Sequence, residues 1–283
     1  MSVEQSLLGQ TTSYPTEYAP EILFPIARAP SRASYAAIAG IAQGMDWWHV
    51  FELSWLDPQG KPHVAIGRLH VPAQSDYLIE SKSLKLYFNS LNFTSFNSQA
   101  ALIDCVEADL SRVANAAIKL ELYAADGLLV SQPTGFCLDT LEPSGFSDVP
   151  DATLLQFDHS QDGTGNGNTA HSDAAYPEVN VYSHLLRSNC PVTGQPDWGT
   201  LFVRYQGVAP CYSSLLAYII SYRQHSGFHE QCVEQIFADI WQHLQPKRLM
   251  VYAAYTRRGG LDINPCRVSD LDWIPAPIRL ARQ

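Results

Sequence analysis

The feature that most constrains the fold is that the chain carries the same order of predicted elements twice. Apolar periodicity and turn signals such as Asp57-Pro58-Gln59-Gly60 predict strand, strand, helix, helix, strand and strand in each half. In the first half these elements are expected at residues 46–56, 63–71, 81–91, 97–113, 118–124 and 128–132. In the second half they are expected at residues 179–187, 200–205, 211–225, 229–244, 249–255 and 261–268.

Short sequence matches in the same order support a duplication of a ββααββ unit. The matched pairs are Ala108-Asp109-Leu110 with Ala238-Asp239-Ile240, Tyr123-Ala124-Ala125 with Tyr252-Ala253-Ala254, and Leu138-Asp139 with Leu261-Asp262. Any one of these matches could arise by chance, but their shared order makes chance a poor explanation. The sequence therefore predicts an α+β protein of two similar units, each with a sheet and two helices.

Composition divides the chain into four parts. Residues 1–45 form a lead-in rich in Pro, Tyr, Ser and Ala, and residues 46–150 form the first module. Residues 151–176 form a polar linker, and residues 177–283 form the second module. The linker holds Gly163-Thr164-Gly165-Asn166-Gly167-Asn168, which begins like a dinucleotide fingerprint. We reject that assignment because the motif ends in Asn and has no strand before it or helix after it.

The charge of the chain argues against nucleic acid as a direct partner. The 283 residues carry a formal net charge of −10, and an acidic surface repels phosphate backbones. No apolar run approaches the roughly 20 residues that span a bilayer. The N-terminus lacks the basic and then apolar pattern of a secretory signal. We therefore expect a cytoplasmic protein that binds neither a membrane nor nucleic acid directly.

The cysteines show no metal or disulfide spacing. They are Cys105, Cys137, Cys190, Cys211, Cys232 and Cys266, and no two form a C-x-x-C pair. In a cytoplasmic chain such cysteines are expected to be reduced and to serve mostly as small buried residues. Cys190 is the exception, because it precedes Pro191 in a turn, where partial exposure is expected.

Cys190 and Asp197 lie at the two ends of a Pro- and Gly-rich loop between two predicted strands. A free thiol has a pKa of about 8.5, so a catalytic cysteine needs a base or a positive environment. An ionised carboxylate nearby would oppose thiolate formation, unless it accepts the thiol proton and later returns it. Spacing alone also allows an ordinary hairpin with a structural cysteine and an Asp in the turn.

Three further segments combine residues that can carry chemistry. His229-Glu230 opens the last long helix, where a carboxylate is already favoured by the helix dipole. Glu80 precedes a helix start with Lys82 and Lys85, which suits either a solvated first turn or a site for an anionic phosphate and a ring N–H group. The Gly-rich bend Arg257-Arg258-Gly259-Gly260 is either an ordinary hairpin or a phosphate clamp.

The two copies differ at these same segments. Asp57-Pro58 stands in the first copy where Cys190-Pro191 stands in the second. The other exchanges are Gln99-Ala100 for His229-Glu230, and Glu80-Ser81-Lys82 for Pro210-Cys211-Tyr212. Each half holds polar groups that the other lacks, so we expect one composite site rather than two equivalent ones.

Four motifs together resemble the NADPH-dependent 7-cyano-7-deazaguanine reductases in their long, two-module form. They are Glu80-Ser81-Lys82-Ser83-Leu84-Lys85-Leu86-Tyr87, the loop from Ser188 to Gly199, Phe228-His229-Glu230, and the run from Tyr255 to Ile263. The resemblance covers residue 46 to the C-terminus. It implies tandem tunnelling-fold modules, each a ββααββ unit with an antiparallel sheet and two helices.

The resemblance also implies a reaction and a role for each site residue. The nitrile of 7-cyano-7-deazaguanine would be reduced to an aminomethyl group with NADPH, in tRNA queuosine biosynthesis. Cys190 would form a covalent thioimide, Asp197 would donate a proton, and His229 would assist. The substrate would be bound by Ile79, Glu80, Ser81, Phe228, His229 and Glu230. NADPH would be bound by Ser81, Lys82, Arg258 and Gly259.

The resemblance implies a homo-oligomer, at least a dimer, and no metal. Two alternatives stay open at this point. One is a zinc-dependent cyclohydrolase of the same architecture, which needs Cys and His ligands converging on a metal. The other is a purine- or pterin-binding module without activity, from which an intact pair of Cys190 and Asp197 would distinguish an enzyme.

Overall fold

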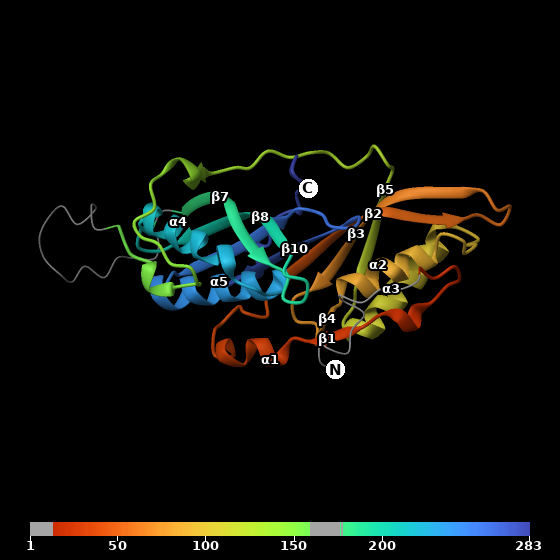
Figure 1. The fold of residues 1–283 in the computed structure, drawn as a ribbon, viewed down its shortest axis with the longest axis horizontal. Coiled ribbons are helices and arrows are strands. Elements are labelled where there is room, and N and C mark those ends of the chain that lie inside the picture. The colour runs from red at the N-terminus through yellow and green to blue at the C-terminus, as the bar shows by residue number, and fades with distance from the viewer. Residues whose placement is uncertain (1–13, 159–175, 177) are drawn as a thin grey trace, which may run out of the picture.

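The computed structural model describes residues 14–158, 176 and 178–283 and shows a mixed α+β fold (Figure 1). Eight strands form one sheet. Their order across the sheet is β5 (Lys119–Tyr123), β3 (Pro62–Pro72), β2 (Gly44–Leu56), β10 (Leu261–Val268), β9 (Arg248–Tyr255), β8 (Pro196–Gln206), β7 (Glu178–Asn189) and β6 (Phe136–Cys137). Neighbouring strands are antiparallel except for the short pair β6 and β7. Strands β2 and β10 join the two halves into one surface.

The four long helices pack on one face of this sheet, two for each half (Figure 1). Helices α2 (Ser81–Ser90) and α3 (Gln99–Ala114) share an apolar core with β2, β3 and β5. Helices α4 (Tyr212–Ile220) and α5 (His229–Leu244) share a second core with β7, β8 and β9. Because strand side chains alternate between faces, Trp48 enters the first core while Trp47 joins an apolar cluster on the opposite face.

The predicted duplication is visible in details of the two halves. In both, a helix tyrosine donates a hydrogen bond to the aspartate of the matched Ala-Asp motif: Tyr87 to Asp109 at 2.9 Å, and Tyr218 to Asp239 at 2.6 Å. The first hairpin of each half carries a register shift at the same place, between Val50 and Leu53 and between Ser183 and Leu186. Helices α3 and α5 both end in a left-handed residue, Asn115 and Gln245.

Three local predictions from the sequence were wrong. Residues 128–132 are not a strand: Leu129 is 81% exposed, and the outer edge of β5, to which such a strand would pair as β10 pairs with β9, has no partner strand among the described residues. Leu138-Asp139 begins a short 3-10 turn (Leu138–Thr140), whereas its supposed match Leu261-Asp262 lies in β10. The helix expected to run to 225 ends at Ile220 and continues as a 3-10 turn (Ser221–Gln224).

The segment expected as a lead-in packs against both halves. Strand β1 (Pro25–Ala27) pairs with β4 (Tyr77–Ile79), which leads directly to Glu80. Phe24 accepts a hydrogen bond from the Glu80 N–H at 2.9 Å and donates its own N–H to the Ser83 hydroxyl at 3.1 Å. Beyond β1, the short helix α1 (Ala29–Arg32) lies beneath α5 (Figure 1). The segment thus links the start of α2 to α5.

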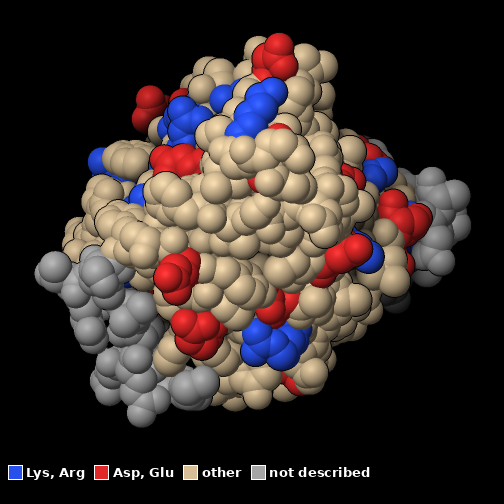
Figure 2. Space-filling model, turned by 90° about the vertical axis from the view of Figure 1, so that its right-hand side faces the viewer, with Lys and Arg blue, Asp and Glu red and all other residues tan. Residues whose placement is uncertain are grey.

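Charged side chains are mixed on the end of the molecule shown in Figure 2. Lysine and arginine alternate there with aspartate and glutamate, and the described residues of that face form no continuous basic area. Among the residues that the structure describes, no helix is both long enough and apolar enough to cross a membrane. The rejected Gly/Asn motif of the linker lies outside the described residues.

Candidate active site

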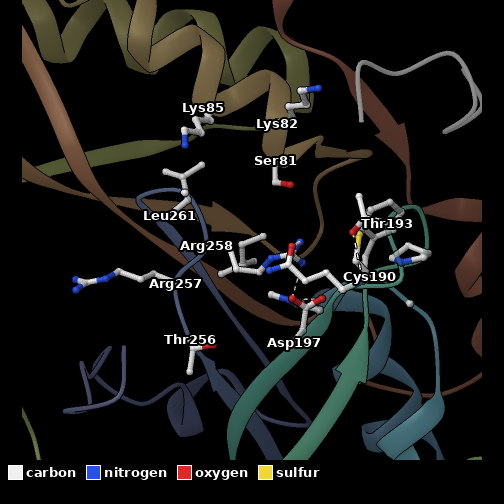
Figure 3. Close-up of a pocket in the computed structure, with 17 residues that line it drawn as sticks. Ser81, Lys82, Lys85, Cys190, Thr193, Asp197, Thr256, Arg257, Arg258 and Leu261 are labelled. Atoms are coloured by element: carbon white, nitrogen blue, oxygen red, sulfur yellow. Dashed lines mark hydrogen bonds and ion pairs between the residues drawn. The ribbon is translucent and has the colours of Figure 1, made fainter. Parts of the chain in front are cut away.

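A cavity of about 620 Å³ lies where the two halves meet. Its wall is built from four segments: the first turns of α2, the loop between β7 and β8, the start of α5, and the bend between β9 and β10 with the start of β10. The lining side chains include Ser81, Lys82, Lys85, Cys190, Thr193, Gln195, Asp197, Phe228, His229, Thr256, Arg257, Arg258, Gly259 and Leu261 (Figure 3). Residues of both halves of one chain therefore line a single cavity.

The backbone fixes the position of Cys190. Its N–H donates to the Gln195 carbonyl at 2.9 Å, and its carbonyl accepts from the Gly194 N–H at 3.0 Å. The preceding residue, Asn189, donates to the His225 carbonyl at 2.7 Å, which ties the end of β7 to the segment that starts α5. Cys190 is only 9% exposed, so it is more buried than its turn position suggested, but it still lines the cavity.

The surroundings of Cys190 favour its thiolate. Burial alone would raise the pKa of the thiol, yet the Thr193 hydroxyl, the backbone N–H groups of Thr193 and Val192, and the Arg258 charge lower it below the ordinary value. Thr193 comes from the same loop, so the loop carries its own hydrogen-bond donors to the sulfur. The activation of the sulfur therefore rests on these donors and on Arg258.

Asp197 is held as a carboxylate by Arg258 and His229. Its Oδ1 lies 2.6 Å from Nη1 of Arg258, and its Oδ2 lies 3.4 Å from Nε2 of His229. Its side chain is 3% exposed, and burial alone would raise its pKa, but His229 and Arg258 bring the pKa below the ordinary value. In this state Asp197 accepts hydrogen bonds and is not an acid.

The ring of Tyr255 stacks on the imidazole of His229 and restricts its orientation. His229 is the first residue of α5, and its ring stacks on that of Tyr255 with centroids 3.8 Å apart and planes 7° apart. Its Nε2 faces Asp197, whereas its buried Nδ1 has no hydrogen-bond partner among the described residues. The stack therefore aims one ring nitrogen at Asp197 and leaves the other available.

The bend between β9 and β10 sends its two arginines in different directions (Figure 3). Arg258 points at Asp197 and also donates to the side-chain carbonyl of Gln195. Arg257 points away, and its guanidinium lies 4.9 Å from the ring centre of Phe51. Gly259 has φ +58°, which favours glycine, and a Cβ there would lie 2.7 Å from Nζ of Lys85, so the end of that flexible side chain would have to shift.

Comparison with known proteins identifies the family. A family profile described as "Nitrile reductase, 7-cyano-7-deazaguanine-reductase N-term" matches residues 14–122, and one described as "QueF-like protein" matches residues 196–271. The NADPH-dependent 7-cyano-7-deazaguanine reductase of Acinetobacter baumannii is 65% identical over 283 residues, covering 100% of both chains. The chain belongs to the 7-cyano-7-deazaguanine reductase family.

Further members of the family align along their whole length. The proteins of the same name from Acinetobacter baylyi and Psychrobacter cryohalolentis are 65% and 48% identical, each with 100% of both chains covered. A crystal structure of an apo archaeosine synthase QueF-Like covers 33% of this chain and 92% of its own at 14% identity, with a TM-score of 0.30. That TM-score is below the level that indicates a shared fold.

Most of the site residues that the family resemblance implied line this one cavity. Those that line it are Ser81, Lys82, Cys190, Asp197, Phe228, His229, Arg258 and Gly259. Three expected substrate residues, Ile79, Glu80 and Glu230, are buried outside the lining. The carboxylate oxygens of Glu80 accept the N–H groups of Lys82 at 2.6 Å and Ser83 at 2.7 Å, so this residue caps α2.

The two glutamates share an environment that favours protonation. Burial raises the pKa of Glu80 despite its two backbone donors. Burial, and next the nearby Asp46, raise the pKa of Glu230, whereas Arg28 and His229 oppose the increase. Glu230 therefore depends on Arg28, a residue of the segment expected as a lead-in, to keep its negative charge.

Sequence reasoning missed three residues that shape the site. Thr193 stabilises the Cys190 sulfur, Gln195 holds Arg258, and Tyr255 supports His229. All three lie within the quoted motifs, so the signal was present, but their roles depend on which way the side chains point. Among the described residues no group of three or more His, Cys, Asp or Glu side chains is placed to hold a metal ion.

Proposed function

We propose that this protein reduces the nitrile of 7-cyano-7-deazaguanine to the primary amine of 7-aminomethyl-7-deazaguanine, with NADPH as the reductant, in tRNA queuosine biosynthesis. The relatives that match over their whole length carry this reductase name. The observation that carries the proposal is a cysteine of lowered pKa that lines a cavity together with Asp197 and His229. We further propose that the duplicated halves are tandem tunnelling-fold modules.

Cys190 performs the covalent step in this proposal. Its thiolate adds to the nitrile carbon, and the nitrogen takes up a proton, which gives a thioimide with a C=N bond. Hydride addition at that carbon and departure of the sulfur leave an imine, and a second hydride and proton give the amine. NADPH supplies both hydrides, one molecule after the other.

Asp197 and His229 handle the protons. Asp197 is the proton donor to the nitrile-derived nitrogen, and His229 assists from its place 3.4 Å away. The Tyr255 ring limits the movement of His229 to rotation in its own plane. A proton can therefore pass between two groups whose positions are fixed before substrate binds.

The deazaguanine ring is proposed to lie between the starts of α2 and α5. Ser81 and Phe228 line the cavity there, and Ile79 is a buried residue next to Glu80. In this proposal Ile79 contacts the ring, and the carboxylates of Glu80 and Glu230 turn toward the cavity to accept the ring N–H groups. A carboxylate is the group that best accepts two neighbouring N–H donors.

The remaining cavity wall fits the cofactor. Ser81, Lys82, Lys85 and Arg258 present hydroxyl, ammonium and guanidinium groups to one space, and Gly259 leaves that space open. Such groups bind phosphates. Lys82, Arg258 and Gly259 would therefore hold NADPH at its phosphates. We also propose a cytoplasmic homodimer that takes a small deazapurine substrate and contacts no nucleic acid directly.

The test is to incubate the protein with 7-cyano-7-deazaguanine in the absence of NADPH and to measure its intact mass. We expect one adduct, located on Cys190 by peptide mapping and absent from Cys190→Ala. Cys211→Ala, at a half-buried cysteine outside the cavity, is the matched control and should keep the adduct. Adding NADPH should then release the aminomethyl product. A folded wild-type protein that forms no adduct would contradict the proposal.

A further inference from the structure

One guanidinium serves two proposed parts of this site. Arg258 belongs to the proposed phosphate-binding group, yet its Nη1 lies 2.6 Å from Oδ1 of Asp197, the proposed proton donor. Its Nη2 donates to the side chain of Gln195. Both Nη atoms of the guanidinium therefore bind the loop that carries Cys190 and Asp197, and Asp197 lies 61 residues before Arg258 in the sequence. Figure 3 shows this side chain between Asp197 and the lysines of α2.

We propose that Asp197 holds Arg258 until the phosphates of NADPH bind Arg258 in its place, so that cofactor binding prepares Asp197 to carry the protons of the hydride steps that follow adduct formation. This inference rests on the proposed function and adds a positioning role for Arg258. The side chain of Arg258 is 32% exposed, whereas that of Asp197 is 3% exposed. The arginine is thus the partner with room to move. Phosphate oxygens form strong paired hydrogen bonds with a guanidinium, and they compete directly with a carboxylate.

Release of Arg258 changes Asp197 in the direction that catalysis needs. The charged or titratable groups around Asp197 are Arg258 from the β9–β10 bend, His229 and Cys232 from α5, and Tyr255 from β9. Of these, Arg258 and His229 favour the carboxylate, and burial opposes it. Without Arg258, burial acts against His229 alone, so the pKa of Asp197 rises and the residue can take up and donate a proton.

The sharpest test is that removal of the Asp197 charge should strengthen cofactor binding. The Kd for NADPH is measured by fluorescence on the substrate-free protein, because NADPH would reduce the preformed Cys190 adduct during the titration. Asp197→Asn frees Arg258, so we expect the Kd to fall by about fivefold or more. In an Arg258→Gln background the same substitution should change the Kd by less than about twofold, because no pair is left to break.

Glu52→Gln is the matched control. Glu52 is an exposed acid beside Gly260 and lines a small neighbouring cavity with Lys85 and Gly259. The hydrogen bonds and the ion pair of the Arg258 side chain go to Asp197 and Gln195 instead. Glu52→Gln removes one negative charge near the proposed cofactor site, as Asp197→Asn does. The Kd for NADPH should change by less than about twofold, since exposed charges are screened. An equal fall in Kd for Glu52→Gln and Asp197→Asn would assign the effect to general charge and overturn the inference.

Proton uptake gives a second readout. Calorimetry in two buffers of different ionisation enthalpy should show that NADPH binding takes up protons in mildly acidic solution, because the pKa of Asp197 rises on binding. Asp197→Asn should lose this uptake. An unchanged or weaker Kd in Asp197→Asn, with adduct formation intact in the wild type, overturns the inference and leaves the proposed function standing. A wild-type protein that binds no NADPH contradicts both.

Discussion

The imidazole of His229 lies flat against the phenol ring of Tyr255, with ring centres 3.8 Å apart. This contact joins the first residue of α5 to the last residue of β9, so two elements of the second half fix one catalytic group. Nε2 of His229 then faces Asp197 at 3.4 Å. The proton transfer proposed for His229 and Asp197 would thus depend on a ring that is not part of the cavity wall.

Replacing Tyr255 should separate this support from the chemistry. Tyr255→Leu removes the stacked ring, so His229 gains other orientations, and we expect turnover to fall by about tenfold or more. Tyr255→Phe keeps the stack and should retain most of the activity. The free energy of unfolding from urea titration should fall by about 1–3 kcal/mol in Tyr255→Leu. Equal turnover in Tyr255→Leu and Tyr255→Phe would show that the stack has no catalytic role.

The reactivity of Cys190 should extend to lower pH than that of an ordinary cysteine. Its pKa is lowered, so thiolate is present below the usual thiol range and is lost only when the pH falls through the lowered value. Thr193→Val removes a donor to the sulfur and should move the pH profile of iodoacetamide labelling to higher pH. Thr193→Ser keeps the hydroxyl and should leave the profile in place. A Thr193→Val profile equal to the wild type would remove Thr193 from this role.

Arg28 should prove essential to the fold and to Glu230. It is buried, it pairs with Asp46 at 2.6 Å, and it lies 3.6 Å from Glu234. Breaking a buried ion pair at one partner costs about 3–5 kcal/mol. We expect Arg28→Met to lose that amount in urea unfolding, and to weaken 7-cyano-7-deazaguanine binding because the pKa of Glu230 rises further. Arg32→Met is the control, because Arg32 also pairs with Glu234 but is more exposed. It should lose less unfolding free energy and less affinity for 7-cyano-7-deazaguanine than Arg28→Met.

The local elements were predictable because their causes are local. The hairpin around Asp57-Pro58-Gln59-Gly60 formed as expected, since its turn signal and flanking alternation lie within a few residues. Residues 128–132 have similar β-rich composition and formed no strand, although the outer edge of β5 has no partner strand among the described residues. Leu129 and Val130 are exposed there, so the segment lacks the burial that would hold it on the sheet.

The sequence predicted which residues form the candidate site better than it predicted the contacts between them. The family motifs named Cys190, Asp197, His229 and Arg258, and the structure brings all four to one cavity. No pattern in the sequence indicated that Arg258 pairs with Asp197, because that contact depends on how two separate bends face each other. Glu80 shows the same limit, since a carboxylate at a helix start suits both a cap and a ligand site.

Gly259 offers a test of the cofactor space that leaves the covalent chemistry untouched. Gly259→Ala places a methyl group 2.7 Å from Nζ of Lys85 and forces a non-glycine residue to φ +58°. The left-handed conformation alone costs about 1–2 kcal/mol, so a control with the same strain is needed. Gly60→Ala provides it, because Gly60 has φ +79° and nothing lies within 4 Å of its added Cβ. Both variants should lose similar stability, but only Gly259→Ala should raise the Kd for NADPH, by about tenfold. Both should form the Cys190 adduct at wild-type rates, and a Gly259→Ala protein with unchanged NADPH affinity would place the cofactor elsewhere.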